Sequence, residues 1–146
     1  MTTVLVLQGP NLNLLGTRQP EIYGHETLEQ IHEGIERRAR ELGLTVDFFQ
    51  SNHEGALIDR LHRRDFDAAI VNAGGLTHTS VALRDALLAI QRPFVEVHLS
   101  DPSTRESFRH VNFLHDIAIE SIVGKGTRGY HLALEVLAGR EGESRG

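Results

Sequence analysis

The fold of this chain is decided by one stretch, Ala68-Ala69-Ile70-Val71-Asn72-Ala73-Gly74-Gly75-Leu76-Thr77-His78. The apolar residues at its start are typical of a strand buried on both faces, and the polar residues and paired glycines after them are typical of a loop. A segment with helical period follows, and its apolar stripe, expected to face the sheet, consists of Val81, Ala82, Ala86 and Ile90. Strand, polar loop and helix in this order predict one unit of a parallel α/β fold.

The same alternation extends in both directions along the chain. Short apolar runs predict further strands at 4–7, 45–49, 94–97 and 117–123, and helical periodicity predicts further helices at 28–42, 57–61 and 130–137. Thr27 and Gln30 predict a capping box at the start of the first helix, and Gly43 predicts its end. Gly139 predicts the end of the last helix, so that residues 140–146 would form a frayed tail.

Five strands that alternate with helices in a chain of 146 residues predict a single domain, 1–146, of the α/β class. The expected architecture is a three-layer sandwich around a flavodoxin-like five-stranded parallel sheet with strand order 2-1-3-4-5. In that order, strands 1, 3 and 4 are neighbours, and a ligand would bind beyond their carboxyl ends.

Composition excludes several classes of function. The chain has no cysteine, which excludes disulfides, thiol nucleophiles and cysteine metal sites. Its formal net charge of −5, without a cluster of basic residues, argues against nucleic-acid binding. No apolar run approaches the length of a membrane span, and the first residues do not resemble a signal peptide, so we expect no membrane association and a cytoplasmic location.

Polar residues gather in the loops that follow strands 1, 3 and 4. The residues with this placement are Asn11, Arg18, Tyr23, Asn72, His78, His98, Arg105 and Arg109. Since the carboxyl ends of parallel strands share one edge of the sheet, these side chains predict a site for a small anionic ligand rich in oxygen. The loop over 9–24 is long for a connection from a strand to a helix, which favours a lid.

Common occupants of this fold do not match these loops. A receiver domain needs clustered aspartates where this chain has Gln8-Gly9 and Asn72, and a flavodoxin needs hydroxyl residues where residues 9–16 have none. No glycine-rich dinucleotide or P-loop motif occurs. The nine histidines lack the close spacing of metal ligands, so we expect no metal site.

The loops resemble those of type II 3-dehydroquinate dehydratases (type II 3-dehydroquinases). The matching segments are Gly9-Pro10-Asn11-Leu12, 18–24, 50–55, 72–85, Glu96-Val97-His98-Leu99-Ser100 and 105–109. The resemblance implies dehydration of 3-dehydroquinate to 3-dehydroshikimate through an enolate, as a step of the shikimate pathway and without a cofactor. It also implies a homo-oligomer in which trimers assemble into a dodecamer.

The resemblance also implies roles for individual residues. Tyr23 would remove the α-proton, Arg18 would hold it as tyrosinate, and Asn11 would stabilise the enolate oxygen. His98 would protonate the departing hydroxyl, and Glu96 would orient His98. The residues that would hold the substrate are Asn72, His78, Leu99, Ser100, Arg105, Arg109 and, from a neighbouring subunit, Asp85.

Two segments depart from the family pattern. Asn112-Phe113-Leu114-His115 stands where the family usually carries Ser-Tyr/Phe-x-Ser, and Lys125 replaces an apolar residue. Because neither lies on a catalytic motif, we expect these departures to affect contacts between subunits more than chemistry. A non-catalytic protein that binds a polyhydroxy acid on the same scaffold is the alternative function, although a binder would need neither Tyr23 nor Arg18.

Overall fold

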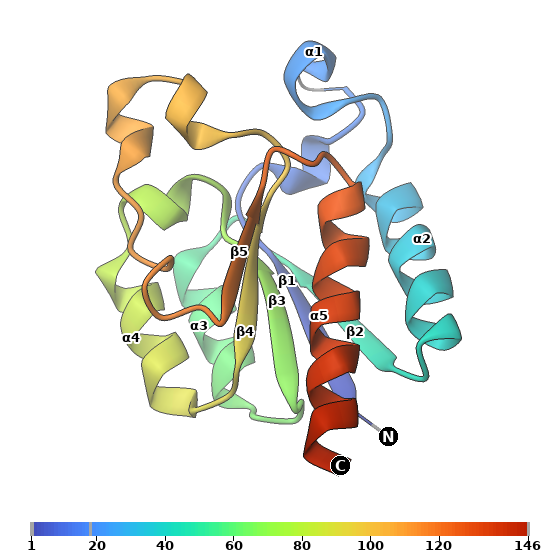
Figure 1. Cartoon of the computed structure of the whole chain (residues 1–146). Helices are drawn as coiled ribbons and strands as arrows, with labels where there is room; N and C mark the ends of the chain where they lie inside the picture. The colour runs from blue at the N-terminus through green and yellow to red at the C-terminus, as the bar shows by residue number, and fades with distance from the viewer. Residues whose placement is uncertain (1, 18, 146) are drawn as a thin grey trace.

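Five parallel strands form one sheet at the centre of the molecule (Figure 1). The structure, a computed structural model, describes residues 2–17 and 19–145, and its description of side chains leaves out Tyr23 and residues 142–145. The strands are β1 (Thr3–Gln8), β2 (Thr45–Gln50), β3 (Ala68–Asn72), β4 (Phe94–His98) and β5 (Glu120–Val123). Their order is β2-β1-β3-β4-β5 with every pair parallel, which confirms the predicted flavodoxin-like sheet.

Helices cover both faces of the sheet and complete the three-layer sandwich (Figure 1). On one face lie α2 (Leu28–Glu41) and α5 (Arg128–Arg145), and on the other lie α3 (Glu54–His62) and α4 (Val81–Ile90). The strand side chains alternate between the two cores, so that Val4 and Val6 join the first and Leu5 and Leu7 join the second. Burial on both faces explains why these strands are almost entirely apolar.

Shorter helices lie beyond the carboxyl ends of the strands. They are η1 (Leu12–Leu14), α1 (Pro20–Tyr23), η2 (Gly74–His78), η3 (Pro102–Thr104) and η4 (Ser107–His110). In Figure 1 they gather at one end of the molecule, above the sheet. This end carries the polar loops that the sequence singled out.

The start of α2 shows that its local sequence sets its bounds. The Thr27 hydroxyl accepts a hydrogen bond from the backbone N–H of Gln30 (3.2 Å), and the Gln30 side-chain oxygen accepts one from the N–H of Thr27 (3.0 Å). This is the predicted capping box. Gly43 follows the last turn with φ of +74°, a conformation that glycine adopts without strain.

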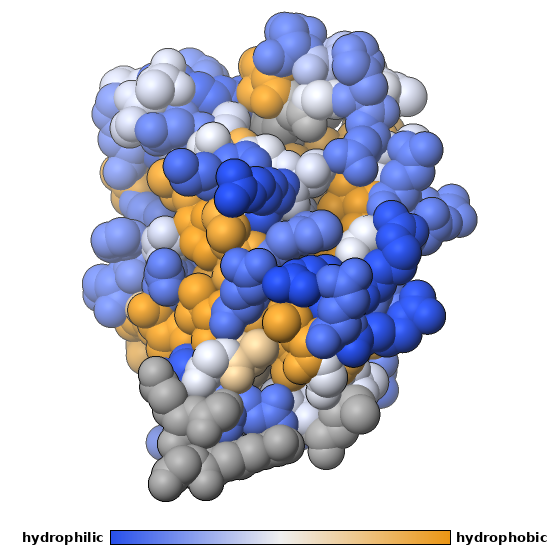
Figure 2. Space-filling view, turned by 45° about the vertical axis from the view of Figure 1, so that its right-hand side comes forward, coloured by the Kyte–Doolittle hydropathy of each residue, from blue (hydrophilic) through white to orange (hydrophobic). Residues whose placement is uncertain are grey.

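The face that carries α2 and α5 presents mostly hydrophilic side chains with apolar areas between them (Figure 2).

The predicted stripe of α4 is confirmed at Ala86 and Ile90 and wrong at Val81 and Ala82. The buried residues of this helix are Leu83, Ala86, Leu87 and Ile90. Val81 is 52% exposed, and Ala82 is exposed as well. The Ser80 hydroxyl caps Leu83 N and sets the start of the helix, and packing against the sheet places Leu83 and Leu87 on the buried face.

Two predicted boundaries also need correction. The last helix does not end at Gly139: α5 continues to Arg145, through the residues expected to fray. A single glycine costs a helix only about 1 kcal/mol, which flanking helix formers can offset. The last strand begins at Glu120 and not at residue 117, because the N–H groups of Ile117 and Ala118 bond to the Leu114 carbonyl in a turn.

Among residues 2–17 and 19–145, no helix combines the length and the apolar character needed to cross a bilayer.

Candidate active site

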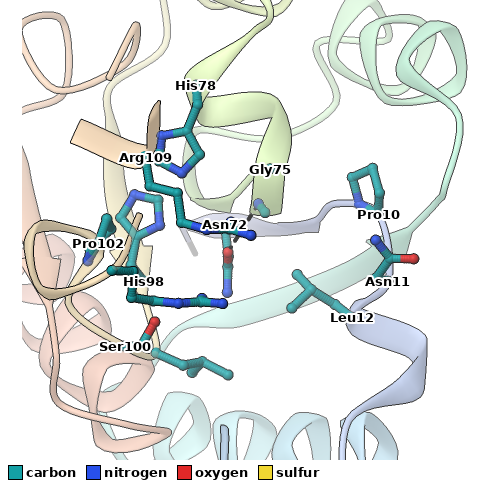
Figure 3. Close-up of a pocket in the computed structure, with 13 residues that line it drawn as sticks. Pro10, Asn11, Leu12, Asn72, Gly75, His78, His98, Ser100, Pro102 and Arg109 are labelled. Carbon is teal, nitrogen blue, oxygen red and sulfur yellow. Dashed lines mark hydrogen bonds between the residues drawn. The ribbon is translucent and has the colours of Figure 1, made fainter. Parts of the chain in front are cut away.

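A cavity of about 160 Å³ opens where β1, β3 and β4 end. Its described lining consists of Pro10, Asn11, Leu12, Asn72, Gly74, Gly75, His78, His98, Leu99, Ser100, Pro102, Arg105 and Arg109. Figure 3 shows His98, Ser100 and Arg109 on one side, Asn11 and Leu12 on the other, and Asn72 between them. The structure therefore brings together eight of the residues that the sequence assigned to the site, drawn from three separate loops.

Asn11 is held in place by the neighbouring strand ends. It has φ of +70°, and its backbone N–H donates to Asn52 Oδ1 at 2.9 Å. Gln50 Nε2 donates to the carbonyl of Gly9 at 3.1 Å. A Cβ at Gly9 would lie 2.3 Å from the Ala73 carbonyl oxygen, so only glycine lets the β1 and β3 loops approach this closely.

Asn72, the last residue of β3, has a fixed orientation. Its Oδ1 accepts a hydrogen bond from Gly74 N (3.2 Å), and its Nδ2 donates to the Tyr130 hydroxyl (3.0 Å). Tyr130 in turn donates to Gln8 Oε1 at 2.8 Å. All three residues of this hydrogen-bonded series are buried, so the amide of Asn72 has a single orientation toward the cavity.

His98 and Glu96 form a hydrogen-bonded pair on β4. They are two residues apart and therefore project from the same face of the strand. His98 Nε2 donates to Glu96 Oε2 at 2.9 Å, which leaves Nδ1 as the ring nitrogen for a ligand in the cavity. Glu96 is fully buried behind His98 and is not among the lining residues. Glu96 is thus in direct hydrogen-bond contact with the ring that it is predicted to orient.

The carboxylate of Glu96 is kept ionised by its surroundings. Burial acts to raise its pKa, but hydrogen bonds and charge from His98, with further bonds from Ser121 and Asn112, outweigh burial and lower it. An ionised carboxylate against Nε2 holds the imidazole in one tautomer and one orientation. The pair is therefore equipped to supply a proton to a ligand.

Positive and hydrogen-bonding groups line the rest of the cavity. Arg109 Nε donates to Glu106 Oε1 (3.1 Å), and Arg105 lies 3.9 Å from the same oxygen, so Glu106 positions both guanidinium groups. His78 Nδ1 lies 2.6 Å from the Val111 carbonyl, so Nδ1 carries a proton and Nε2 remains for a ligand. The described lining contains no aspartate or glutamate, and it suits an anion.

Besides Glu96, three predicted site residues are not in this lining. Arg18 lies outside the described residues, and the side chain of Tyr23 does too, although its backbone in α1 lies at the same end of the molecule (Figure 1). Asp85 is exposed on α4 and does not line the cavity of its own chain.

Asn112 and His115, which the sequence analysis linked to subunit contacts, lie beside Glu96 in a hydrogen-bonded network within the chain. Asn112 Nδ2 donates to Glu96 Oε2 at 2.8 Å, and Ser121 Oγ donates to Glu96 Oε1 at 2.6 Å. His115 Nδ1 lies 3.0 Å from Ser121 Oγ. Sequence analysis missed the links of Asn112, His115 and Ser121 to Glu96, because no local pattern marks them. Only the pairing of Glu96 with Ser121 between β4 and β5 could have indicated one of them.

No group of three or more His, Asp or Glu residues in the described part of the chain gathers closely enough to hold a metal ion.

Comparison with known proteins agrees with this geometry. A model of the class II dehydroquinase family matches residues 2–138. The chain belongs to this family. A 3-dehydroquinate dehydratase of Bordetella avium (strain 197N) is 56% identical over 135 residues, which cover 90% of this chain and 94% of that one. A 3-dehydroquinate dehydratase of Acinetobacter baumannii (strain AYE) is 52% identical over 137 residues, covering 92% and 91%.

A solved structure of the class II dehydroquinase family has the same fold over almost its whole length. The type II dehydroquinase of Butyrivibrio crossotus DSM 2876 superposes with a TM-score of 0.91 at 38% identity and covers 93% of this chain and 97% of that one. The cavity described above is thus a feature of a class II dehydroquinase.

Proposed function

We propose that this class II dehydroquinase is a 3-dehydroquinate dehydratase, a hydro-lyase that forms 3-dehydroshikimate and water in the shikimate pathway. Its relatives carry that name. The observation that carries the proposal for this chain is the pair of His98 and buried Glu96, which faces a cavity lined by two arginines. A protonated imidazole beside an anion site is what the elimination of a hydroxyl from a hydroxy acid requires.

The reaction balances as an elimination through an enolate. Tyr23, held as tyrosinate by Arg18, takes the proton from the carbon next to the ketone, and the electron pair of that C–H bond moves onto the ketone oxygen. Asn11 stabilises this enolate oxygen. When the enolate collapses, the hydroxyl on the β-carbon leaves, and His98 gives it a proton, so that water and a conjugated enone result. Proton exchange with solvent then restores tyrosinate and the imidazolium, and no cofactor or metal enters the scheme.

The other residues of the cavity hold the substrate. Arg105 and Arg109, positioned by Glu106, bind its carboxylate through charge-assisted hydrogen bonds. The hydroxyls bond to the remaining polar groups of the lining, which are Asn72, His78, Ser100 and the backbone at Leu99. The fixed amide of Asn72 distinguishes a substrate with a hydroxyl at the contacted position from an analogue that has hydrogen there.

We also propose that the enzyme forms trimers in which Asp85 enters a neighbouring active site, and that trimers assemble into a dodecamer. Val81 and Leu88 are exposed to 52% and 50%, and they lie four residues before and three after Asp85 on the same helix face. An apolar face of this kind is typical of a surface that a partner covers. Light scattering of the purified chain tests the trimer and the dodecamer, and activity in fractionated cells tests the proposed cytoplasmic location.

The function is tested by adding 3-dehydroquinate and following the absorbance of the conjugated enone. We expect turnover, and we expect Tyr23→Phe and His98→Asn each to lose about 10²–10⁴-fold in kcat. His62→Asn, at the exposed end of α3, is the matched control and retains activity. If the wild-type chain binds 3-dehydroquinate in calorimetry without converting it, the enzyme proposal fails and the alternative binding protein replaces it.

A further inference from the structure

Glu96 is the centre of a buried network that extends away from the cavity. It accepts hydrogen bonds from His98 Nε2 (2.9 Å), Asn112 Nδ2 (2.8 Å) and Ser121 Oγ (2.6 Å). Asn112 is itself oriented, because its Oδ1 accepts from the N–H groups of Leu114 and His115. The network thus reaches from the proposed acid His98 to the turn that carries His115.

The direction of each bond in this network follows from proton counting. A serine hydroxyl has one proton, and Ser121 gives it to the carboxylate of Glu96. Ser121 Oγ can therefore only accept from His115 Nδ1, 3.0 Å away, which places a proton on that nitrogen. The result is a one-way series of donors, from His115 through Ser121 to Glu96, opposite the donor His98.

We propose that His115 is a positioning residue for His98, acting through Ser121 and Glu96, and that the hydrogen bond it donates tunes the pH range over which His98 serves as the acid. The inference deepens the proposed function and rests on His98 having that role. His115 is exposed and does not line the cavity, so it does not contact the substrate. Its effect passes entirely through the two intervening side chains.

The sign of the effect follows from electrostatics. Donation from His115 holds the Ser121 hydroxyl toward Glu96 and so stabilises the carboxylate. A stabilised carboxylate has a weaker hold on the proton of His98, which makes His98 a stronger acid. Without His115, Glu96 would bind that proton more tightly.

Other charged groups surround His115 and set the background for this effect. They are Asp116 beside it in the chain, Arg84 of α4 paired with Asp116, Glu120 of β5, and Asp101, Arg109 and His110, which line a groove together with His115. None of the hydrogen bonds found among the described residues joins His110 to Ser121 or Glu96. His110 is therefore a matched control: it is an exposed imidazole in the same groove that lies outside the network.

The test compares His115→Ala, His115→Asn and His110→Asn with the wild type. We expect His115→Ala to move the basic limb of the kcat–pH profile upward by about half a pH unit and to lower kcat on the plateau about 3- to 10-fold, with little change in KM. His115→Asn keeps a neutral donor at the position of Nδ1, so it should restore most of kcat. His110→Asn should leave the profile unchanged. Equal shifts in His110→Asn and His115→Ala would overturn the inference, as would a wild-type profile in His115→Ala.

A second measurement does not depend on turnover. The titration midpoint of the His98 ring resonance, assigned by its loss in His98→Asn, should move upward in His115→Ala in the ligand-free protein. In a Ser121→Ala background the same His115 substitution should cause no further movement, because the connection is already broken. An equal movement in both backgrounds would show that His115 acts without Ser121, which contradicts the inference. Absence of turnover in the wild type would instead refute the proposed function, and the resonance would still decide the role of His115.

Discussion

Tyr130, in the first turn of α5, accepts a hydrogen bond from Asn72 in the cavity wall, with 3.0 Å between Asn72 Nδ2 and the tyrosine oxygen. Burial raises the pKa of Tyr130 to about 12, against the opposing effect of its hydrogen bonds to Asn72 and Gln8. The hydroxyl therefore stays neutral, and it donates its single proton to Gln8 Oε1. The last helix of the chain thus fixes the amide that β3 presents to the substrate.

Tyr130→Phe removes this link without changing the shape of the core. Asn72 Nδ2 and Gln8 Oε1 lose their partner in a buried site, so we expect the free energy of unfolding to fall by about 1–3 kcal/mol. Because Asn72 then loses its fixed orientation, KM for 3-dehydroquinate should rise more than kcat falls. Urea unfolding and steady-state kinetics measure the two effects. Unchanged KM would show that Gly74 alone orients the amide.

His32 makes the stability of the fold depend on pH. Burial lowers its pKa from 6.5 to about 4, and its Nε2 lies 3.3 Å from Gln8 Nε2, a donor because Gln8 Oε1 already accepts from Tyr130. In the folded state the His32 ring is therefore kept neutral, whereas in the unfolded state it takes up a proton below about pH 6.5. The stabilisation is complete above that pH and is lost as the pH falls toward 4.

His32→Phe should flatten this dependence while keeping the ring stacked on Phe48, whose centroid lies 4.1 Å from that of His32. The wild-type slope of stability against pH should exceed that of the variant by no more than about 1 kcal/mol per pH unit, since His32 is partly exposed and solvent screens it. Chemical unfolding across this range gives the slopes, and His62→Phe serves as the control. Equal slopes in wild type and His32→Phe would mean that another group titrates.

Glu96→Gln should separate chemistry from binding. Glutamine is uncharged and its amide can present an N–H to His98 Nε2, so the His98 ring loses its fixed tautomer and orientation, and kcat should fall by about 10²–10⁴-fold with a small change in KM. Steady-state kinetics with 3-dehydroquinate provides the measurement. Glu120→Gln, an exposed neighbour on β5, should behave like the wild type. Near-normal kcat in Glu96→Gln would remove Glu96 from the mechanism.

Lys125 offers a test of the enolate route against a Schiff base. It is the only lysine of the sequence, and it lies in the exposed turn between β5 and α5, outside the described lining of the cavity. Activity should therefore survive Lys125→Arg, treatment with borohydride in the presence of substrate, and a chelator. Mass spectrometry of the borohydride-treated protein checks for imine chemistry directly, because an adduct on Lys125 together with inactivation would favour it.

Asp85 and Tyr23 should complement one another if subunits share active sites. Asp85→Ala and Tyr23→Phe each inactivate a homotrimer, but in a mixed trimer some sites combine an intact Tyr23 with an intact Asp85 from the next subunit. Co-refolding the two variants should therefore recover part of the activity. Asp59→Ala, an exposed aspartate on α3, should be active alone. Full activity of Asp85→Ala, or inactive mixed trimers of verified composition, would contradict sharing.

The sequence determined the features that depend on neighbours along the chain. Apolar runs gave the strands, the period of 3.6 gave the helices, and Thr27 with Gln30 gave the start of α2, because propensity and capping act within a few residues. Alternation of strands and helices then led to the sheet order, and with it to the edge where Asn11, Asn72 and His98 meet. The family motifs supplied the roles of these residues.

Only the tertiary structure decided what depends on register and packing. The phase of α4 and the continuation of α5 past Gly139 result from contacts and helix propagation that local patterns do not encode. Ser121 bonds to Glu96 from 25 positions along the chain, because the β4–β5 register pairs the two residues. A hydrogen bond needs donor and acceptor within about 3 Å. Periodicity predicts that an element exists, but it does not fix the position of one element against another to that precision, so the network behind His98 emerged only from the folded chain.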